Sequence, residues 1–351
     1  MRSRLWSMGT GVLVTGCAMG LLSLAVWAQD TKETVTVDKA DRTYLVHLPK
    51  GFDAQQHYPV VVLLHGPNQQ AEDMERLTRF NDLADKDSII VVYPNAMQGH
   101  WNVGVTAPQQ RRVYRRGYGR RWGYPGYLPP PPPQQTPRQE EGQRRRQERA
   151  DDVEFFNKML DQLSTQSTVD MSRIYFAGLS DGGFMALRVG CNLSDRVAAI
   201  ASVGAAMPKT MICVPSRPVP VVMVNGTSDP VVKYDGGTGK DGRFQTISAE
   251  DSAKEWAKLD RCGEKPVHSK LPEHGKGGMQ TKVETFDGCQ ENAQVELYSV
   301  KGGGNTWPGG EQYEPENTVG KTSQDFNANE VVWSFLVTRR LPAQNTSQKQ
   351  D

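Results

Sequence analysis

Arg173-Ile174-Tyr175-Phe176-Ala177-Gly178-Leu179-Ser180-Asp181-Gly182-Gly183 is the stretch that decides the fold of this 351-residue chain. It begins as a buried strand would and passes into a helical pattern over residues 183–189. Glycines on both sides of Ser180 allow a sharp turn between strand and helix, which lifts the serine hydroxyl above the edge of a sheet. The Gly-x-Ser-x-Gly pattern is common by chance, but its place between a strand and a helix makes Ser180 a candidate nucleophile.

The rest of the chain repeats this alternation of strand and helix. Apolar runs predict strands over residues 34–37, 43–48, 59–64, 88–93, 197–203, 219–224 and 295–300, and helical spacing predicts helices over 71–84, 151–163, 247–259 and 327–337. Such alternation favours an α/β fold with a mostly parallel sheet that is covered on both faces by helices. We expect one domain over residues 29–341, followed by a flexible tail over 342–351.

Residues 107–150 break the pattern and form a basic insert. They hold 11 Arg and 3 Glu, although the whole chain has a formal net charge of only +1, and they include five consecutive prolines at 129–133. A segment of this composition cannot bury enough apolar surface to offset its ordering entropy, so we expect it to be disordered. It is either an inert solvated loop, a mobile lid, or an arm for an anionic surface such as a cell-envelope polymer.

The N-terminus has the pattern of an export signal. Arg2 and Arg4 precede an apolar run over residues 12–26, and Val26-Trp27-Ala28 offers a cleavage site after Ala28. Lipoprotein processing at Cys17 is the alternative, and it is weaker because the apolar run continues past that cysteine. We therefore expect a secreted or periplasmic protein with residues 1–28 removed and no membrane span after cleavage.

Four cysteines remain after that cleavage: Cys191, Cys213, Cys262 and Cys289. An even number in an exported protein favours two disulfides, and we expect the nearest neighbours to pair, Cys191 with Cys213 and Cys262 with Cys289. No two of these cysteines have the spacing of a zinc site, so we expect no metal. The sequence also indicates no cofactor.

The partners of a nucleophilic serine should follow it in the chain. The apolar run over 219–224 leads to Asp229, at the edge of the predicted sheet where Ser180 also lies. Asp229 is either the acid of a catalytic triad or a turn aspartate before Pro230. The third member should follow the strand over 295–300, in the loop Gly302-Gly303-Gly304-Asn305-Thr306-Trp307-Pro308-Gly309.

Several motifs together resemble the exported esterases related to polyhydroxybutyrate depolymerases and feruloyl esterases. They are Leu64-His65-Gly66, Tyr93-Pro94-Asn95, Trp101, Asp152-Val153, Arg173-Ile174-Tyr175, Gly226-Thr227-Ser228-Asp229 and the two glycine-rich stretches already quoted. The resemblance implies an α/β-hydrolase fold, with Ser180 as nucleophile and Asp229 as the acid. It also implies a histidine at position 305 as the general base, acting on acyl esters of hydroxyacids or plant phenolics.

The chain departs from that pattern at three positions. Asn305 stands in the place of the triad histidine, and a neutral amide cannot take the proton from Ser180. The resemblance makes the N–H of Asp181 one oxyanion donor and places the second just after His65-Gly66, where Pro67 has no N–H to give. Asn225 stands where the family commonly has another histidine.

Another histidine could replace the missing base. His100 and His274 are the leading candidates, while His47 is expected on a strand, His57 in a turn and His65 in a structural role in its loop. A solvated surface histidine is the plainer reading of both.

Two functions therefore remain open from the sequence. The first is a serine carboxylic-ester hydrolase that forms an acyl-enzyme at Ser180. The second is a catalytically impaired homologue that binds a polymer or a cell-envelope surface through the old cleft and the basic insert, while the expected partner of an active enzyme is an ester substrate or polymer. Arginine and aromatic residues interleave in the insert, but we expect no nucleic-acid partner in an exported protein.

Overall fold

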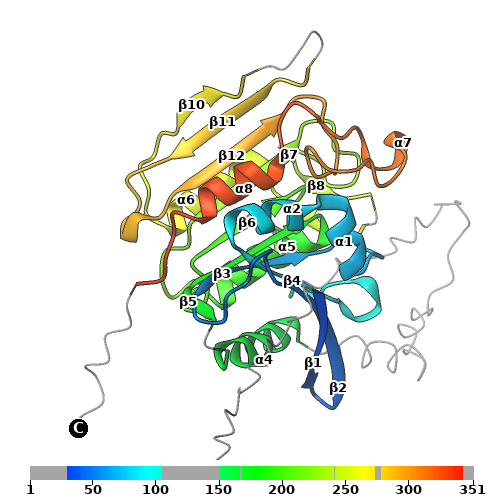
Figure 1. Cartoon of the computed structure of the whole chain (residues 1–351). Coiled ribbons are helices and arrows are strands. Elements are labelled where there is room, and N and C mark those ends of the chain that lie inside the picture. Colours follow the sequence, from blue (N-terminus) through cyan, green and yellow to red (C-terminus); the bar gives the residue numbers. More distant parts are fainter. Residues whose placement is uncertain (1–29, 105–150, 167, 241, 273–277, 343–351) are drawn as a thin grey trace, which may run out of the picture.

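A ten-stranded mixed sheet forms the centre of the molecule in the computed structural model (Figure 1), which describes residues 30–104, 151–166, 168–240, 242–272 and 278–342. The strand order is β1-β2-β4-β3-β5-β6-β7-β12-β11-β10. The proposed signal segment, the basic insert and almost all of the expected tail lie outside the described residues.

Six parallel strands form the middle of the sheet. They are β4 (Ile90–Pro94), β3 (Tyr58–Leu64), β5 (Val169–Leu179), β6 (Ala199–Val203), β7 (Val221–Gly226) and β12 (Val295–Val300). Four of them, β3, β4, β6 and β7, are buried along their whole length, because helices cover both faces. Their carboxyl ends meet at one edge, and that edge carries the candidate site.

Antiparallel strands extend both ends of the sheet. The hairpin of β1 (Asp30–Val37) and β2 (Ala40–His47) joins β4, while β11 (Thr281–Phe286) and β10 (Val267–Lys270) follow β12. Sequence reasoning did not predict β10 and β11. Every residue of β10 is exposed, so the alternation that would reveal a strand is missing there.

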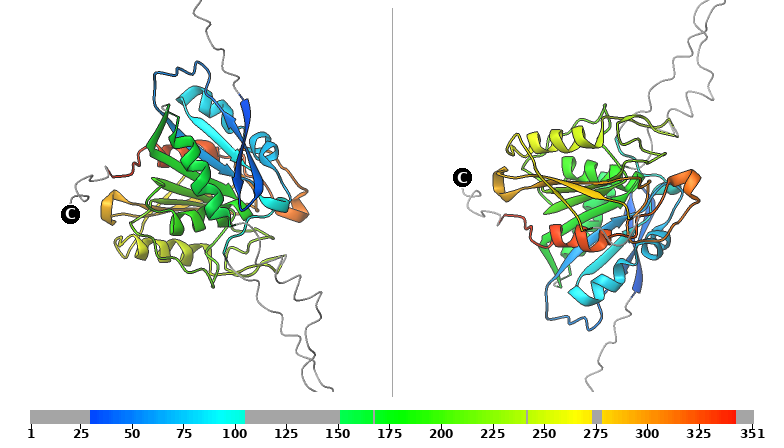
Figure 2. Two further views of the ribbon diagram at one scale, coloured as in Figure 1. Left: turned by 90° about the horizontal axis from the view of Figure 1, so that it is seen from below. Right: turned by 90° about the horizontal axis from the view of Figure 1, so that it is seen from above.

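The sheet separates the hydrophobic core into two clusters, and helices cover each of them. On one face α1 (Ala71–Thr78), α2 (Phe80–Asp87) and α8 (Ala328–Leu336) cover the sheet, and on the other lie α4 (Asp152–Ser164), α5 (Asp181–Asn192) and α6 (Ala249–Leu259) (Figure 2). Successive residues of β3 pack into opposite cores, since side chains alternate along a strand. A short helix, α7 (Glu316–Val319), and a two-stranded ribbon of β8 (Gly237–Thr238) and β9 (Gln245–Thr246) complete the loops beside the site.

The single helix predicted over residues 71–84 is wrong in one respect: the chain forms two helices there. Arg79 takes a left-handed conformation with φ 50° between α1 and α2. The Thr78 hydroxyl donates to Met74 O at 2.8 Å and accepts from the Phe80 N–H at 3.3 Å, so it satisfies backbone groups that the break leaves open. The apolar spacing continues across the break, which is why periodicity alone did not show it.

The predicted disulfides are present, Cys191–Cys213 and Cys262–Cys289. The mostly parallel α/β fold expected from the sequence is confirmed as a single domain with helices on both faces. Across the described ranges, none of the helices has the length and apolar character needed to cross a membrane.

Candidate active site

The turn between β5 and α5 is a nucleophile elbow. Ser180 has φ 55° and ψ −113°, a conformation that costs free energy in any residue with a side chain and persists only where the surroundings enforce it. A Cβ on Gly178 would lie 2.3 Å from the backbone of Gly182, and one on Gly182 would lie 2.1 Å from Leu64 O. Both glycines are therefore required for the strand and the helix to approach so closely.

Ser180 lines a small, largely apolar pocket. The pocket is lined by Pro67, Ser180, Asp181, Phe184, Val231, Val232, Gly239, Phe244 and Thr246. Ser180 is only 2% exposed, and its hydroxyl makes no hydrogen bond to any other described residue. The Ser180 hydroxyl is thus without a partner among the described residues and faces a mostly apolar lining.

Asp229 and Asn305, the residues expected at the positions of a triad acid and base, are in contact. Asn305 Nδ2 donates to Asp229 Oδ2 at 2.7 Å and to Gly204 O at 2.8 Å. Gly204 follows Val203, whose carbonyl accepts the Ser180 N–H at 2.8 Å, so the serine and the amide are anchored to adjacent residues. Asn305 therefore keeps the contact with the acid that a triad histidine would make.

The chemistry of the pair differs from that of a triad. Both hydrogens of the Asn305 amide are used, and Asn305 Oδ1 is buried without a partner among the described residues. Burial raises the pKa of Asp229 to about 7, against the opposing effect of hydrogen bonds from Asn305, Val232 and Val231. A carboxylic acid of that pKa beside a neutral amide has no cation to stabilise and no base to orient.

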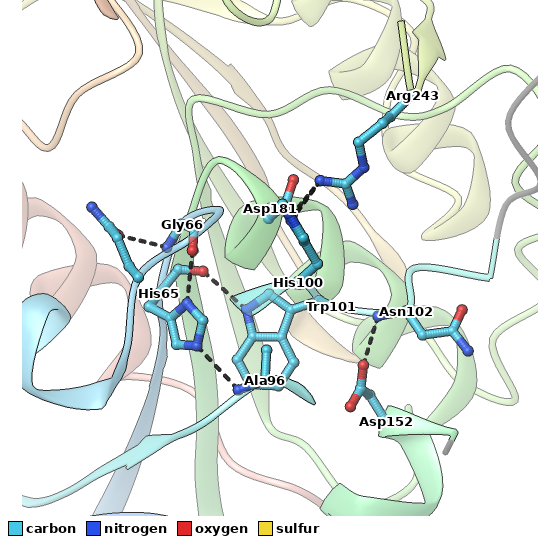
Figure 3. Close-up of polar contacts among 10 residues, drawn as sticks. His65, Gly66, Ala96, His100, Trp101, Asn102, Asp152, Asp181 and Arg243 are labelled. Carbon is cyan, nitrogen blue, oxygen red and sulfur yellow. Dashed lines mark hydrogen bonds and ion pairs between the residues drawn. The ribbon is translucent and has the colours of Figure 1, made fainter. Parts of the chain in front are cut away.

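None of the five histidines in the described part of the chain contacts Ser180. His100 Nδ1 lies 3.0 Å from Asp181 Oδ2 and 2.8 Å from Arg243 Nη1, a donor that requires the Nδ1 lone pair. His100 is thus engaged beside Asp181 and Arg243 (Figure 3). His274, the second candidate base, lies outside the described residues.

His65 has a structural role, as the sequence suggested. Its ring is buried, its Nδ1 donates to Gly66 O at 2.7 Å and its Nε2 accepts from the Ala96 N–H at 3.1 Å (Figure 3). Burial lowers the pKa of His65, so the ring is neutral and this tautomer is fixed. Trp101 Nε1 donates to His65 O at 2.9 Å. These contacts hold the loop that carries Pro67.

Neither residue beside Pro67 offers a free N–H. Pro67 lines the pocket but has no N–H, and its neighbours are occupied: the Gly66 N–H donates to Gln69 Oε1 at 2.9 Å and the Asn68 N–H to Gly99 O at 2.8 Å. The N–H of Asp181, the first residue of α5, has no acceptor within its own helix and remains the one candidate donor. Within the described ranges, no three His, Cys, Asp or Glu residues are grouped in a way that could hold a metal.

Sequence reasoning missed three residues of this region. Arg243 Nη1 donates to Asp181 Oδ2 at 2.7 Å, Phe244 forms part of the pocket wall, and the Tyr313 hydroxyl donates to Asn305 O at 2.9 Å. They lie in loops far from Ser180 in the sequence, where no periodic pattern marks a position. Asn225 is the third position at which the chain departs from the expected family pattern. It is buried on β7, and its amide donates to Ala205 O at 2.9 Å and not to Asp229.

Comparison with known proteins agrees with this architecture. The family described as Esterase PHB depolymerase matches residues 42–104, and Phospholipase/Carboxylesterase matches residues 135–259. NocK of Nocardia uniformis subsp. tsuyamanensis, which is assigned as an esterase, is 27% identical over 88% of this chain and 83% of its own length. Feruloyl esterase B of Piromyces equi is 26% identical over 75% of this chain, which spans only 42% of that protein.

Among solved structures, the acetyl xylan esterase from Aspergillus awamori has a TM-score of 0.49 at 12% identity, over 79% of this chain and 94% of that one. The family matches and the two relatives carry the assignment, together with the elbow in its strand-to-helix setting. These findings support an α/β-hydrolase esterase related to polyhydroxybutyrate depolymerases and feruloyl esterases.

Proposed function

We propose that this protein is a catalytically impaired esterase homologue that binds a carboxylic ester, free or within a polymer, in the cleft above Ser180. One observation carries the proposal: the group that contacts Asp229 is the Asn305 amide, with both hydrogens engaged, and no described histidine reaches Ser180. Serine hydroxyls are poor nucleophiles without a base to take the proton. The engaged donors around Pro67 support the same conclusion.

A serine esterase of the usual acyl-enzyme type is the second candidate. The strained conformation of Ser180 favours it, because such strain is kept mainly at functional sites. His274 would then have to supply the base, or His100 would have to leave Arg243. The two disulfides and the relatives' esterase assignments are compatible with either candidate, and we propose an exported location for both.

Hydrolysis of 4-nitrophenyl butyrate by the native chain, Asn305→His and Ser180→Ala separates the two. We expect native turnover no faster than that of Ser180→Ala. We expect Asn305→His to be faster by about 100-fold or more, the usual contribution of a general base. Native turnover that is fast and is abolished by Ser180→Ala would disprove the impaired function.

Asn225→His is the matched control. It makes the same exchange at a neighbouring buried asparagine whose amide does not contact Asp229, so it should not restore activity. Equal gains in both variants would mean that added imidazole, rather than a completed triad, causes the turnover.

A further inference from the structure

We propose that Phe244, positioned by Arg243, limits the cleft to ligands with a compact, uncharged acyl group. This inference rests on the proposed ester-binding function and names the part of the ligand that the pocket selects. Four apolar residues line the pocket together with Ser180: Phe184, Val231, Val232 and Phe244. A charged acyl group would lose its hydration there without a paired counterion.

Phe244 forms the wall that can limit length. Its ring lies 4.7 Å from the ring of Phe184, and the side chains are 8% and 2% exposed, so the two aromatic residues close the pocket together. Phe184 lies in the first turn of α5, so its backbone position is tied to that of Ser180. Phe244 comes from the turn between β8 and β9 and is the part of the wall that can vary independently.

The backbone fixes one side of that turn. The Gly239 N–H donates to Phe244 O at 3.1 Å and the Lys240 N–H donates to Val231 O at 3.0 Å. The ribbon itself is attached to the body of the protein by the Lys209 N–H, which donates to Gln245 O at 2.8 Å. The main chain of Phe244 therefore has one well-defined position.

Arg243 fixes the other side. Its guanidinium carbon lies 4.8 Å from the Phe244 ring centroid, and its Nη1 donates to Asp181 Oδ2 at 2.7 Å. Asp181 is the residue after Ser180 and its side chain is only 4% exposed. Figure 3 shows Arg243 reaching toward Asp181 and His100. The ion pair thus couples the outer wall of the pocket to the nucleophile elbow, which makes Arg243 a positioning residue.

The test measures binding in a Ser180→Ala background, where no ester is turned over whichever function is correct. Titration calorimetry with 4-nitrophenyl acetate, butyrate and octanoate gives a ratio of octanoate to butyrate affinity for each variant. We expect weak octanoate binding in the parent and a rise of this ratio of about 10-fold or more in Phe244→Ala, because removing the ring opens the end of the pocket. Arg243→Ala should raise the ratio less, and Arg243→Lys, which keeps a cation for Asp181, should restore the parent value.

Phe335 and Arg339 provide the matched controls. Arg339 lies over the Phe335 ring at 5.0 Å, and Phe335 is 5% exposed, but Phe335 packs in the core on the opposite face of the sheet. Phe335→Ala and Arg339→Ala should leave the ratio unchanged. Thermal unfolding of each variant identifies any that do not fold.

An unchanged ratio in folded Phe244→Ala would overturn the inference, and so would a parent that binds none of the three esters. Fast turnover by the native chain would instead overturn only the impaired function. In that case the ratio of kcat/KM for the two esters in the Ser180 protein would give the same test of Phe244.

Discussion

Asn305, in our proposal, keeps the position of a triad histidine without its chemistry. Its amide donates to Asp229 as an imidazole would, yet its oxygen is buried without a partner among the described residues. An unsatisfied buried acceptor costs about 1–3 kcal/mol, so this asparagine is not explained by stability. Asn305 makes the hydrogen bond to Asp229 that we would expect of a histidine, but its amide cannot act as a base.

Pro67 gives the prediction at this scale. In an Asn305→His background, Pro67→Ala should raise kcat for 4-nitrophenyl butyrate by about 10- to 100-fold with little change in KM, because the restored N–H would stabilise charge that develops in the transition state. The same substitution in the native chain should have no effect, since without a base no oxyanion forms. If kcat rises equally in both backgrounds, Pro67 acts through something other than the oxyanion.

At the scale of elements, the junction between α6 and β7 contains a buried carboxyl group. Asp260 is the C-cap of α6 and is fully buried, its Oδ1 accepts from the Val219 N–H at 2.8 Å, and its Oδ2 has no partner among the described residues. Burial raises the pKa of Asp260 to about 7, and the hydrogen bond from Val219 and the charge of Arg217 only partly oppose it. This end of α6 is therefore most stable with a protonated Asp260.

The free energy of unfolding should consequently fall as the pH rises from about 4 to about 7. In that window the folded chain keeps a proton that the unfolded chain, with an ordinary carboxyl pKa, has released. Asp260→Asn keeps an acceptor for the Val219 N–H but cannot lose a proton. In this variant the decrease in the free energy of unfolding with pH should be smaller by about 2–4 kcal/mol. Urea unfolding at pH 4.5 and pH 8 measures it.

The control for Asp260 is Asp251→Asn, which changes an exposed carboxylate of the same helix. It should leave the difference between the two pH values as it is in the native protein. An Asp260→Asn protein that still loses as much stability as the native chain would show that other groups cause the pH dependence.

At the scale of the whole molecule, the site is an assembly of distant segments on one edge of the sheet. Ser180 follows β5, Asp229 follows β7 and Asn305 follows β12, strands that are parallel and therefore end at the same edge. Two disulfides tie the loops on the side of α5 and α6: Cys191 lies in the last turn of α5, and Cys262 follows α6. They stabilise the fold by restricting the conformations of the unfolded chain, and their cysteines do not line the pocket.

Reduction of the disulfides should lower stability without changing ligand selection. Loops of 22 and 27 residues predict a loss of about 3 kcal/mol for each bond from chain entropy. Urea unfolding with and without dithiothreitol, and of each paired Cys→Ala variant, measures the loss. The octanoate-to-butyrate ratio of the folded protein should stay constant, and a shift in it would place the disulfides in the ligand site.

Much of the fold could be predicted because its signals are local. The buried strands β3 and β7 are continuous apolar runs between turn residues, and the elbow is recognisable from glycines that must lie beside Ser180. The exposed edge strand β10 and the break at Arg79 could not be predicted. In β10 no face is buried, and at Arg79 the apolar spacing runs through the break.

The sequence alone determined the α/β architecture, the nearest-neighbour disulfides and the substitution of an amide for a base at position 305, since these depend on residue type and order. Tertiary structure alone decided what surrounds that amide. The bond from Asn68 to Gly99, the contact of His100 with Arg243, and the ring of Phe244 against Phe184 all join segments far apart in the chain. Only the folded sheet brings such groups within hydrogen-bond or van der Waals distance, and these contacts decide which donors, bases and walls the cleft contains.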